Sequence, residues 1–236
     1  MRCSSADRSQ RATNRDAHAA VDSTAAPPTA AALSNRPTRR TRAGANGGVA
    51  VTAAGRGADL SLAARVDAPR ETYDFETAAG VCSPDEFRGA ELALVEELWE
   101  RELGRLLVVE ANYGVPGVLL ADASQGVAMT ESSARAAGLC ETNAERNGVG
   151  DAAVVATVAG PREFASVTGT ATGDFDTAAC APKPYTPLAV ANERLVAVLE
   201  RLRPRGRLFV AARERTGLGR FADTLASVAG SVETVG

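Results

Sequence analysis

RLLVVEANYGVPG, residues 105–117, is the stretch of sequence that decides the fold. Its first half is a short apolar run that includes β-branched residues, which is typical of a buried parallel strand. The run ends in an acid, Glu110, and the chain then turns through Gly114 and Gly117. A strand that ends in this way and turns through glycine into a helix brings backbone N–H groups close to a ligand. The alternative interpretation is an ordinary strand-to-helix turn that binds nothing.

Strands and helices alternate on both sides of this turn. Apolar runs predict strands at residues 105–110, 126–131, 152–158, 175–180 and 207–211, and the start of another at 231–235. Helical spacing predicts helices at residues 83–101, 132–147, 188–202 and 218–228, and a further one that opens at 118. Ser83 is expected to cap the first helix, with Pro84 at its first position. The alternation predicts an α/β fold, a Rossmann-like doubly wound and mostly parallel sheet, whose ligand lies beyond the carboxyl ends of the strands.

A second acid, Glu131, closes the next predicted strand. An acid about twenty residues after a glycine-bearing turn can accept hydrogen bonds from both ribose hydroxyls of a nucleoside cofactor. The alternative role is to cap the helix that follows, for which Ser132 and Ser133 are rival caps. The order of the two motifs favours the cofactor interpretation, in which Glu131 and Ser132 are both cofactor-binding candidates.

Residues 130–148 read TESSARAAGLCETNAERNG. This segment resembles the pattern "acid, then A-x-x-x-A-x-x-N-A-x-x-N-G" of the methyltransferase small-domain family, which includes rRNA guanine-N2 methyltransferases. Residues 75–98 resemble the lead-in of the same group, and the resemblance extends from about Leu60 to Val235. It implies a class I methyltransferase with S-adenosylmethionine as its cofactor.

The resemblance also implies roles for individual residues. Glu131 would bind the ribose, and the loop from Glu110 to Gly117 would line the methionine end of the cofactor. The usual form of that loop is E/D-x-G-x-G-x-G. Here Asn112 replaces one of these glycines, and Gly114 and Gly117 are the two glycines of the loop.

The sequence Ala181-Pro-Lys-Pro-Tyr185 follows the fourth predicted strand. It resembles the (N/D/S)-P-P-(Y/F) motif of amino-directed nucleic-acid methyltransferases, but Ala181 replaces the polar residue and Lys183 separates the prolines. The resemblance implies that Tyr185 stacks on a flipped base and that the carbonyl of Ala181 or Pro182 accepts a hydrogen bond from the target amine. Pro182, Lys183 and Tyr185 are therefore the catalytic candidates, with Lys183 either facing an anionic substrate or solvated. The alternative is a proline-stiffened loop that caps a strand end.

Charge divides the chain into two parts. The first seventy of the 236 residues hold 11 Arg and 5 Asp, a net charge of +6, which leaves 15 basic and 24 acidic residues and a net charge of −9 in the remainder. An acidic body is not the usual footprint of tight, unaided nucleic-acid binding. Residues 1–57 are rich in Arg, Ala and Thr and are predicted to be a disordered leader, and residues 58–236 are predicted to be the methyltransferase domain.

The four cysteines and the single histidine, His18, show no metal-ligand spacing, so neither a metal site nor a disulfide framework is expected. The sequence has no apolar run long enough to span a membrane. A cytoplasmic protein with reduced thiols is expected, with RNA, specifically rRNA, as its partner. The sequence does not indicate an oligomeric state.

Three hypotheses follow. The first is an S-adenosylmethionine-dependent methyltransferase that acts on an amino group of rRNA, or on a small molecule or protein. The second is a catalytically degenerate relative that binds only cofactor or a partner, which Asn112, Ala181 and a sheet truncated before its final strands would favour. Such truncation would leave an open sheet edge. The third is another nucleotide-binding protein such as a short-chain dehydrogenase, against which the chain lacks a Tyr-x-x-x-Lys pair.

Overall fold

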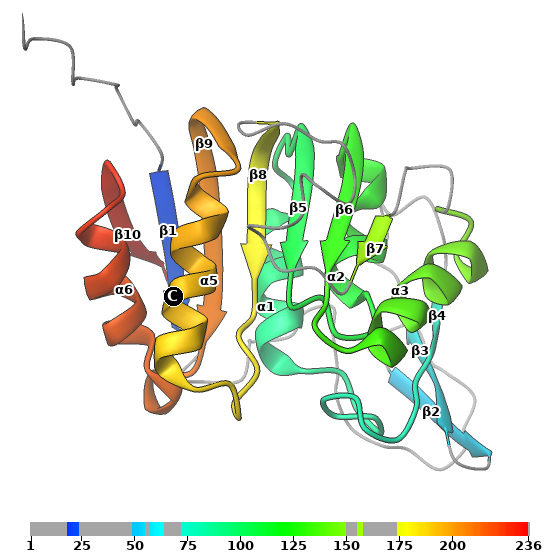
Figure 1. Cartoon of the computed structure of the whole chain (residues 1–236). Helices are drawn as coiled ribbons and strands as arrows, with labels where there is room; N and C mark the ends of the chain where they lie inside the picture. The colour runs from blue at the N-terminus through cyan, green and yellow to red at the C-terminus, as the bar shows by residue number, and fades with distance from the viewer. Residues whose placement is uncertain are drawn as a thin grey trace, which may run out of the picture.

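A seven-stranded sheet forms the centre of the protein (Figure 1). The computed structural model describes residues 18–23, 49–54, 57–63, 72–149, 155–157 and 174–235. Every neighbouring pair of strands in the sheet is parallel. In spatial order the strands are β10 (Ser231–Val235), β1 (His18–Ser23), β9 (Leu202–Ala212), β8 (Phe175–Cys180), β5 (Arg105–Val109), β6 (Gly126–Thr130) and β7 (Val155–Thr157).

Helices cover both faces of this sheet. They are α1 (Gly89–Leu98), α2 (Val115–Leu119), α3 (Ala134–Arg146), α5 (Leu188–Leu199) and α6 (Leu218–Ala226), with short 3₁₀ turns at η1 (Ala121–Ala123) and η3 (Glu214–Thr216). Side chains of β5 alternate between two cores. Leu106 and Val108 pack with residues of α1, α2 and α3, whereas Leu107 and Val109 pack with residues of α5 and α6. This three-layer arrangement confirms the predicted doubly wound α/β fold.

A second, antiparallel sheet consists of β2 (Val49–Ala54), β3 (Gly57–Ala63) and β4 (Thr72–Glu76). One edge of β4 pairs with β3. The other edge of β4 is covered by two asparagines, Asn143 within α3 and Asn147 at the C-terminal cap of that helix. Asn143 accepts from the Glu76 N–H (2.7 Å) and donates to its carbonyl (3.0 Å), and Asn147 binds the backbone of Asp74 in the same way (2.9 and 2.8 Å). The two asparagines of the NAERN segment therefore join α3 to the small sheet.

The first predicted helix begins later than expected. Ser83 has a left-handed backbone (φ 54°), and its carbonyl accepts from the Glu86 N–H, so residues 83–86 form a turn. The helix begins at Gly89, and its N-terminal cap is Arg88. Ser83 as a helix cap was therefore wrong, because a capping residue needs an extended backbone.

Two strands lie within residues 1–57, which the sequence predicts as disordered. β1 pairs with β9 on one side and with β10 on the other, and β2 pairs with β3. The other residues of that segment, except Gly57 at the start of β3, lie outside those described. The predicted strand at 231–235 is confirmed as β10, and β1 pairs with the side of β9 that faces away from β8. The short run HAAVDS becomes a strand because both neighbours supply backbone hydrogen bonds.

Candidate functional site

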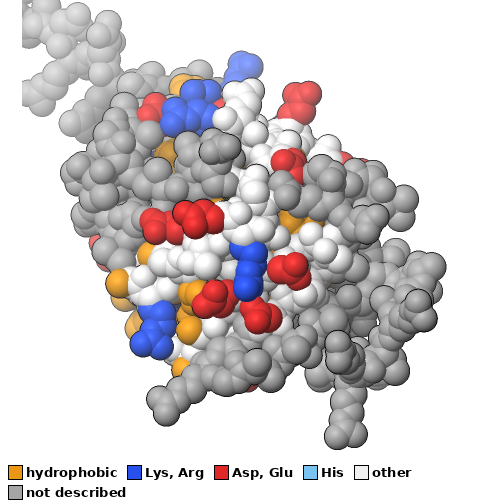
Figure 2. All heavy atoms as spheres, turned by 90° about the vertical axis from the view of Figure 1, so that its right-hand side faces the viewer, with side chains coloured by type: hydrophobic (Ala, Val, Ile, Leu, Met, Phe, Trp, Pro, Cys, Tyr) orange, Lys and Arg blue, Asp and Glu red, His pale blue; other side chains and the backbone are white. Residues whose placement is uncertain are grey.

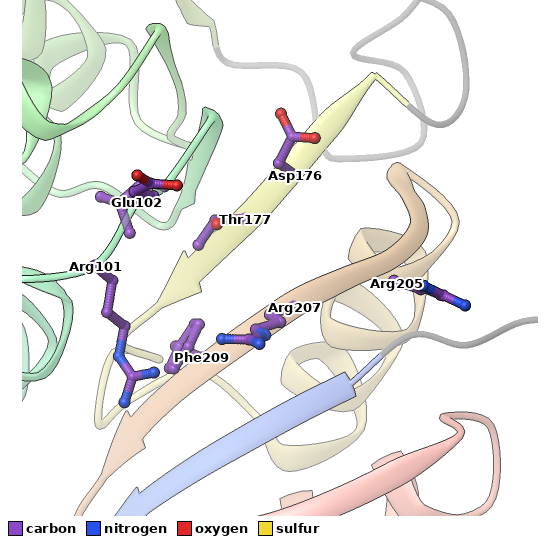
Figure 3. Close-up of a pocket in the computed structure, with 8 residues that line it drawn as sticks. Arg101, Glu102, Asp176, Thr177, Arg205, Arg207 and Phe209 are labelled. Atoms are coloured by element: carbon purple, nitrogen blue, oxygen red, sulfur yellow. The ribbon is translucent and has the colours of Figure 1, made fainter.

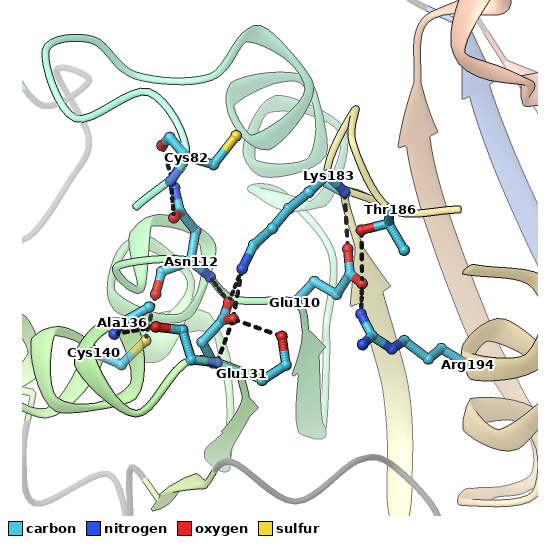
Figure 4. Close-up of polar contacts among 12 residues, drawn as sticks. Cys82, Glu110, Asn112, Glu131, Ala136, Cys140, Lys183, Thr186 and Arg194 are labelled. Atoms are coloured by element: carbon cyan, nitrogen blue, oxygen red, sulfur yellow. Dashed lines mark hydrogen bonds and ion pairs between the residues drawn. The ribbon is translucent and has the colours of Figure 1, made fainter. Parts of the chain in front are cut away.

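Three strand ends meet at the carboxyl edge of the large sheet. Glu110 directly follows β5, Glu131 directly follows β6, and the loop 181–187 follows β8. Because β5 lies between β6 and β8, these residues come together as the sequence predicts (Figure 4).

The loop after β5 turns sharply. Glu110, Asn112 and Gly114 all have left-handed backbones, with φ of 56°, 58° and 95°. Gly114 caps α2, and a Cβ at this position would lie 3.2 Å from the Cα of Cys140, so only glycine fits here. A Cβ at Gly117 would lie 2.4 Å from the sulfur of Met129. Gly117 is thus explained by close packing of α2 on β6.

The carboxylate of Glu131 is buried and directed at this loop. Its Oε2 accepts a hydrogen bond from the Asn112 N–H (2.8 Å). Its Oε1 accepts from the Ser133 N–H (3.1 Å) and the Ser132 hydroxyl (3.3 Å). Ser133, rather than Glu131, caps α3 by accepting from the Ala136 N–H. Glu131 is therefore not needed as the side-chain cap of α3.

Lys183 binds the same carboxylate. Its Nζ lies 2.5 Å from Oε1 and 2.6 Å from Oε2 of Glu131, and the two side chains are only 6% and 0% exposed. The chain's single lysine is therefore neither solvated nor directed outward (Figure 4).

Glu110 holds the loop after β8. Its carboxylate accepts from the Lys183 N–H (2.8 Å) and the Thr186 hydroxyl (3.5 Å), and it forms an ion pair with Arg194 of α5. Each of the two acids is thus paired with one basic side chain, Glu110 with Arg194 and Glu131 with Lys183.

Arg88 is a site residue that the sequence analysis missed. Its guanidinium donates to the carbonyls of Ala181 (3.0 Å) and Pro182 (2.9 Å) and pairs with the buried Glu91 (2.9 Å). Burial raises the pKa of the Glu91 carboxyl despite the opposing effect of Arg88. Ala181 lies 93 residues from Arg88, so no local pattern indicates the contact.

A cavity of about 300 Å³ opens at this edge of the sheet. Of the predicted site residues, Ser132, Lys183 and Tyr185 line it, whereas the remaining ones do not. The other lining residues are Gly80, Val81, Ser133, Ala136, Thr186, Pro187, Val190 and Arg194. Tyr185 is 66% exposed, more than any other large hydrophobic side chain among the described residues.

A second cavity, of about 420 Å³, lies at the opposite, amino-terminal ends of the strands (Figure 3). Its residues are Arg101, Glu102, Leu103, Asp176, Thr177, Arg205, Arg207 and Phe209, none of which was predicted to belong to the site. The Arg101 guanidinium lies over the Phe209 ring at 5.3 Å and pairs with Glu97, so it is already engaged.

Acidic and basic side chains are interspersed on the side that carries α3 and the small sheet, and those drawn as described form no continuous basic patch there (Figure 2). Within the described ranges no group of His, Cys, Asp and Glu could hold a metal ion. No helix in the same ranges is long and apolar enough to cross a membrane.

Two neighbouring strands of this doubly wound sheet each end in an acid, and a glycine-bearing turn follows the first strand. This arrangement is typical of proteins that bind a nucleoside cofactor. That is the class which the fold and the site define. The family is narrower, because residues 72–236 match the family model of the methyltransferase small domain. The chain belongs to the methyltransferase small domain family, and the enzymes of this class use S-adenosylmethionine.

Solved structures share the fold. The 16S rRNA N2 G1207 methyltransferase of T. thermophilus, in complex with AdoMet and guanosine, is 23% identical (TM-score 0.57), and the match covers 71% of this chain and 44% of that one. Precorrin 8W decarboxylase of Methanobacterium thermoautotrophicum is 19% identical (TM-score 0.51), and the match covers 65% of this chain and 77% of that one. This chain therefore spans less than half of the T. thermophilus enzyme. None of the curated proteins matches its sequence.

Proposed function

We propose that this protein transfers a methyl group from S-adenosylmethionine to an amino group of an rRNA base, and that residues 58–236 form the catalytic domain, to whose sheets β1 and β2 add strands. The observation that carries the proposal is the Glu131 carboxylate, which is buried and directed at the N–H of Asn112. A fixed carboxylate beside a glycine-bearing turn suits the two hydroxyls of a ribose.

The donor set fits this cofactor. Glu131 and Ser132 would hold the ribose, and the loop with Glu110, Asn112, Gly114 and Gly117 would lie beside the methionine end. When bound, the cofactor supplies a methyl group on a sulfonium. The chain's task is then to orient the acceptor, because an in-line displacement depends on position.

Tyr185 supports a nucleic-acid base as the acceptor. Its ring is exposed and lines the cavity, where a flipped base could stack on it. The carbonyls of Ala181 and Pro182 each accept one hydrogen bond from Arg88, and a carbonyl oxygen has two lone pairs. Each therefore keeps one lone pair with which it could accept a hydrogen bond from an amino group. The guanosine bound to the T. thermophilus enzyme supports the same class of acceptor.

The proposal is tested with labelled S-adenosylmethionine, using naked 16S rRNA, assembled small ribosomal subunits and total cellular protein as acceptors. Label is expected in RNA, at an exocyclic amine. Glu131→Gln is expected to abolish cofactor binding in calorimetry, with exposed Glu141→Gln on α3 as the matched control. Equal affinity of Glu131→Gln and the wild type would contradict the ribose assignment.

Tyr185→Ala separates the acceptor from the cofactor. Stacking of a base on an aromatic ring contributes about 1–3 kcal/mol, so methyl transfer should fall about 5- to 150-fold while cofactor affinity stays unchanged. Tyr185→Phe should retain activity, and Val228→Ala is a control at another exposed apolar residue. If cofactor binds and no label moves to any acceptor, the degenerate alternative is correct.

A further inference from the structure

We infer that Lys183 is a latch on the cofactor site: in the cofactor-free protein its ammonium occupies the place on Glu131 that the ribose hydroxyls would take. S-adenosylmethionine then binds by displacing the ammonium of Lys183 from Glu131 and out of the cavity. The inference rests on the proposed function and concerns the gating of that same site.

The hydrogen bonds of Glu131 leave no room for both partners. A carboxylate has about four lone-pair sites for hydrogen bonds. Three donors of the fixed frame already bind it, namely the N–H groups of Asn112 and Ser133 and the hydroxyl of Ser132. Lys183 contacts both oxygens at 2.5 and 2.6 Å. About one site is then left, and Lys183 holds it. Ribose hydroxyls can bind Glu131 only after the ammonium has left, and two of them bind only when the Ser132 hydroxyl, at 3.3 Å the longest of the three contacts, also turns from Glu131 to the ribose.

The shape of the cavity agrees with this competition. Lys183 lines the cavity, whereas Glu131 does not and is only 2% exposed. The lysine side chain therefore separates the open space from the carboxylate. The cavity volume of about 300 Å³ lies at the lower end of the range for ligand sites. Movement of Lys183 would enlarge the space and expose the carboxylate.

The lysine side chain can move without disturbing its loop. The Lys183 N–H is fixed on Glu110 at 2.8 Å, and the guanidinium of Arg88 holds the two preceding carbonyls. Four flexible carbon atoms join this fixed backbone to the ammonium. A buried carboxylate that loses its cation is strongly destabilised unless other donors replace it. The ribose hydroxyls supply those donors, so release of Lys183 and cofactor binding are coupled.

The wild-type chain offers a direct test, because Lys183 is its only lysine. The protein is acylated with an N-hydroxysuccinimide ester, and the extent of modification is measured by peptide mass spectrometry, with the amino-terminal amine as the internal reference. Lys183 should react slowly in the free protein and several times faster with saturating S-adenosylmethionine or S-adenosylhomocysteine. An unchanged or slower rate with ligand would overturn the latch.

Two variants give a second readout in calorimetry. Lys183→Met keeps the length of the side chain without its charge, and it should bind S-adenosylmethionine at least about fivefold more tightly than the wild type. Lys183→Arg keeps the cation and should not bind more tightly. A thermal melt checks that each variant is folded. If Lys183→Met does not fold, the acylation of the wild-type protein decides the question.

The outcomes distinguish this inference from the proposed function. If the wild type binds cofactor but either the acylation rate of Lys183 or the affinity of a folded Lys183→Met variant does not change as expected, the latch is wrong and the proposed function stands. If Lys183→Met binds S-adenosylmethionine and the wild type does not, the latch is supported, and Lys183 then keeps the wild-type site closed. If neither protein binds S-adenosylmethionine, the proposed function fails, and the latch with it.

Discussion

The side-chain amide of Asn112 pairs with the backbone of Cys82 through two hydrogen bonds: Oδ1 accepts from the Cys82 N–H (3.0 Å), and Nδ2 donates to the Cys82 carbonyl (2.8 Å). Asn112 stands where the usual loop of the family has glycine, and a glycine could make neither bond. The asparagine thus fixes the segment before α1 on the loop that follows β5, and asparagine tolerates the left-handed backbone better than most residues.

Asn112→Ala should destabilise the protein by about 2–4 kcal/mol, because it leaves two buried backbone groups of Cys82 unpaired and puts alanine in a left-handed conformation. Asn112→Gly loses the same hydrogen bonds without that strain, so it should be more stable than Asn112→Ala by about 1 kcal/mol. Urea unfolding measures both. If Asn112→Ala were as stable as the wild type, the two hydrogen bonds between Asn112 and Cys82 would contribute nothing to the stability of the protein.

Gly117→Ala tests the packing of α2 on β6. The new Cβ would collide with the buried side chain of Met129, and overpacking of a core costs about 1–3 kcal/mol. Met129→Ala in the same chain should make the added methyl tolerable. Gly138→Ala is the matched control, because this exposed position within α3 has open space around it and helix propensity should raise the stability by up to about 1 kcal/mol. Equal effects at the two glycines would contradict the packing role of Gly117.

Arg88→Met should leave the Glu91 carboxylate buried without its cation, at a cost of about 3–5 kcal/mol near neutral pH. Burial raises the pKa of Glu91, so the native variant holds a proton there that the unfolded chain releases at lower pH. Its stability should therefore be highest at acidic pH and fall as pH rises above about 4.3, the ordinary pKa of glutamate. Urea midpoints measured across pH check this. The double variant Arg88→Met/Glu91→Leu should recover most of the loss, and failure to do so would place the effect in the two carbonyl contacts.

Burial raises the pKa of the Cys140 and Cys180 thiols well above the ordinary value. Both should stay protonated, and so resist iodoacetamide, at about pH 8.5, where free cysteine is half ionised. Since the pKa is higher in the folded state, the stabilisation is complete below about pH 8.5 and is lost at higher pH, because the unfolded chain then releases these protons. Peptide mass spectrometry follows the alkylation, and the same reaction in denaturing urea is the control. Rapid alkylation of either native thiol would contradict the burial.

Local patterns predicted the order of the elements well. The strands at 175–180 and 231–235 have the predicted bounds, because each is a short segment with β-branched or aromatic residues that lies near a glycine in the sequence. β9 begins at Leu202, five residues before the prediction, since a register shift against β8 accommodates Pro204 and the left-handed Arg205. A register shift of this kind leaves no periodic pattern in the sequence, so the earlier start of β9 could not be predicted.

The acids of the site were predictable and their partners were not. Glu131 was placed by its distance from the glycine turn, which is a local property of a strand and a loop. The contact of Lys183 with Glu131 joins residues 52 apart, and that of Arg88 with Ala181 joins residues 93 apart. These contacts arise only when the sheet brings distant strand ends together, so residue type and spacing along the chain do not indicate them.

The asparagine contacts that join α3 to β4 also bear on chemical ageing. Asn147 precedes Gly148, and asparagine before glycine is prone to deamidation, because the following backbone nitrogen attacks the side-chain carbonyl with little steric hindrance. Here that nitrogen donates to the Glu145 carbonyl at 2.9 Å, and the amide is held on Asp74. Aspartate at this position would set a carboxylate oxygen against the carbonyl of Asp74. The hydrogen bonds that join α3 to the small sheet thus also slow the deamidation of Asn147, a reaction that would break the contact between the helix and that sheet.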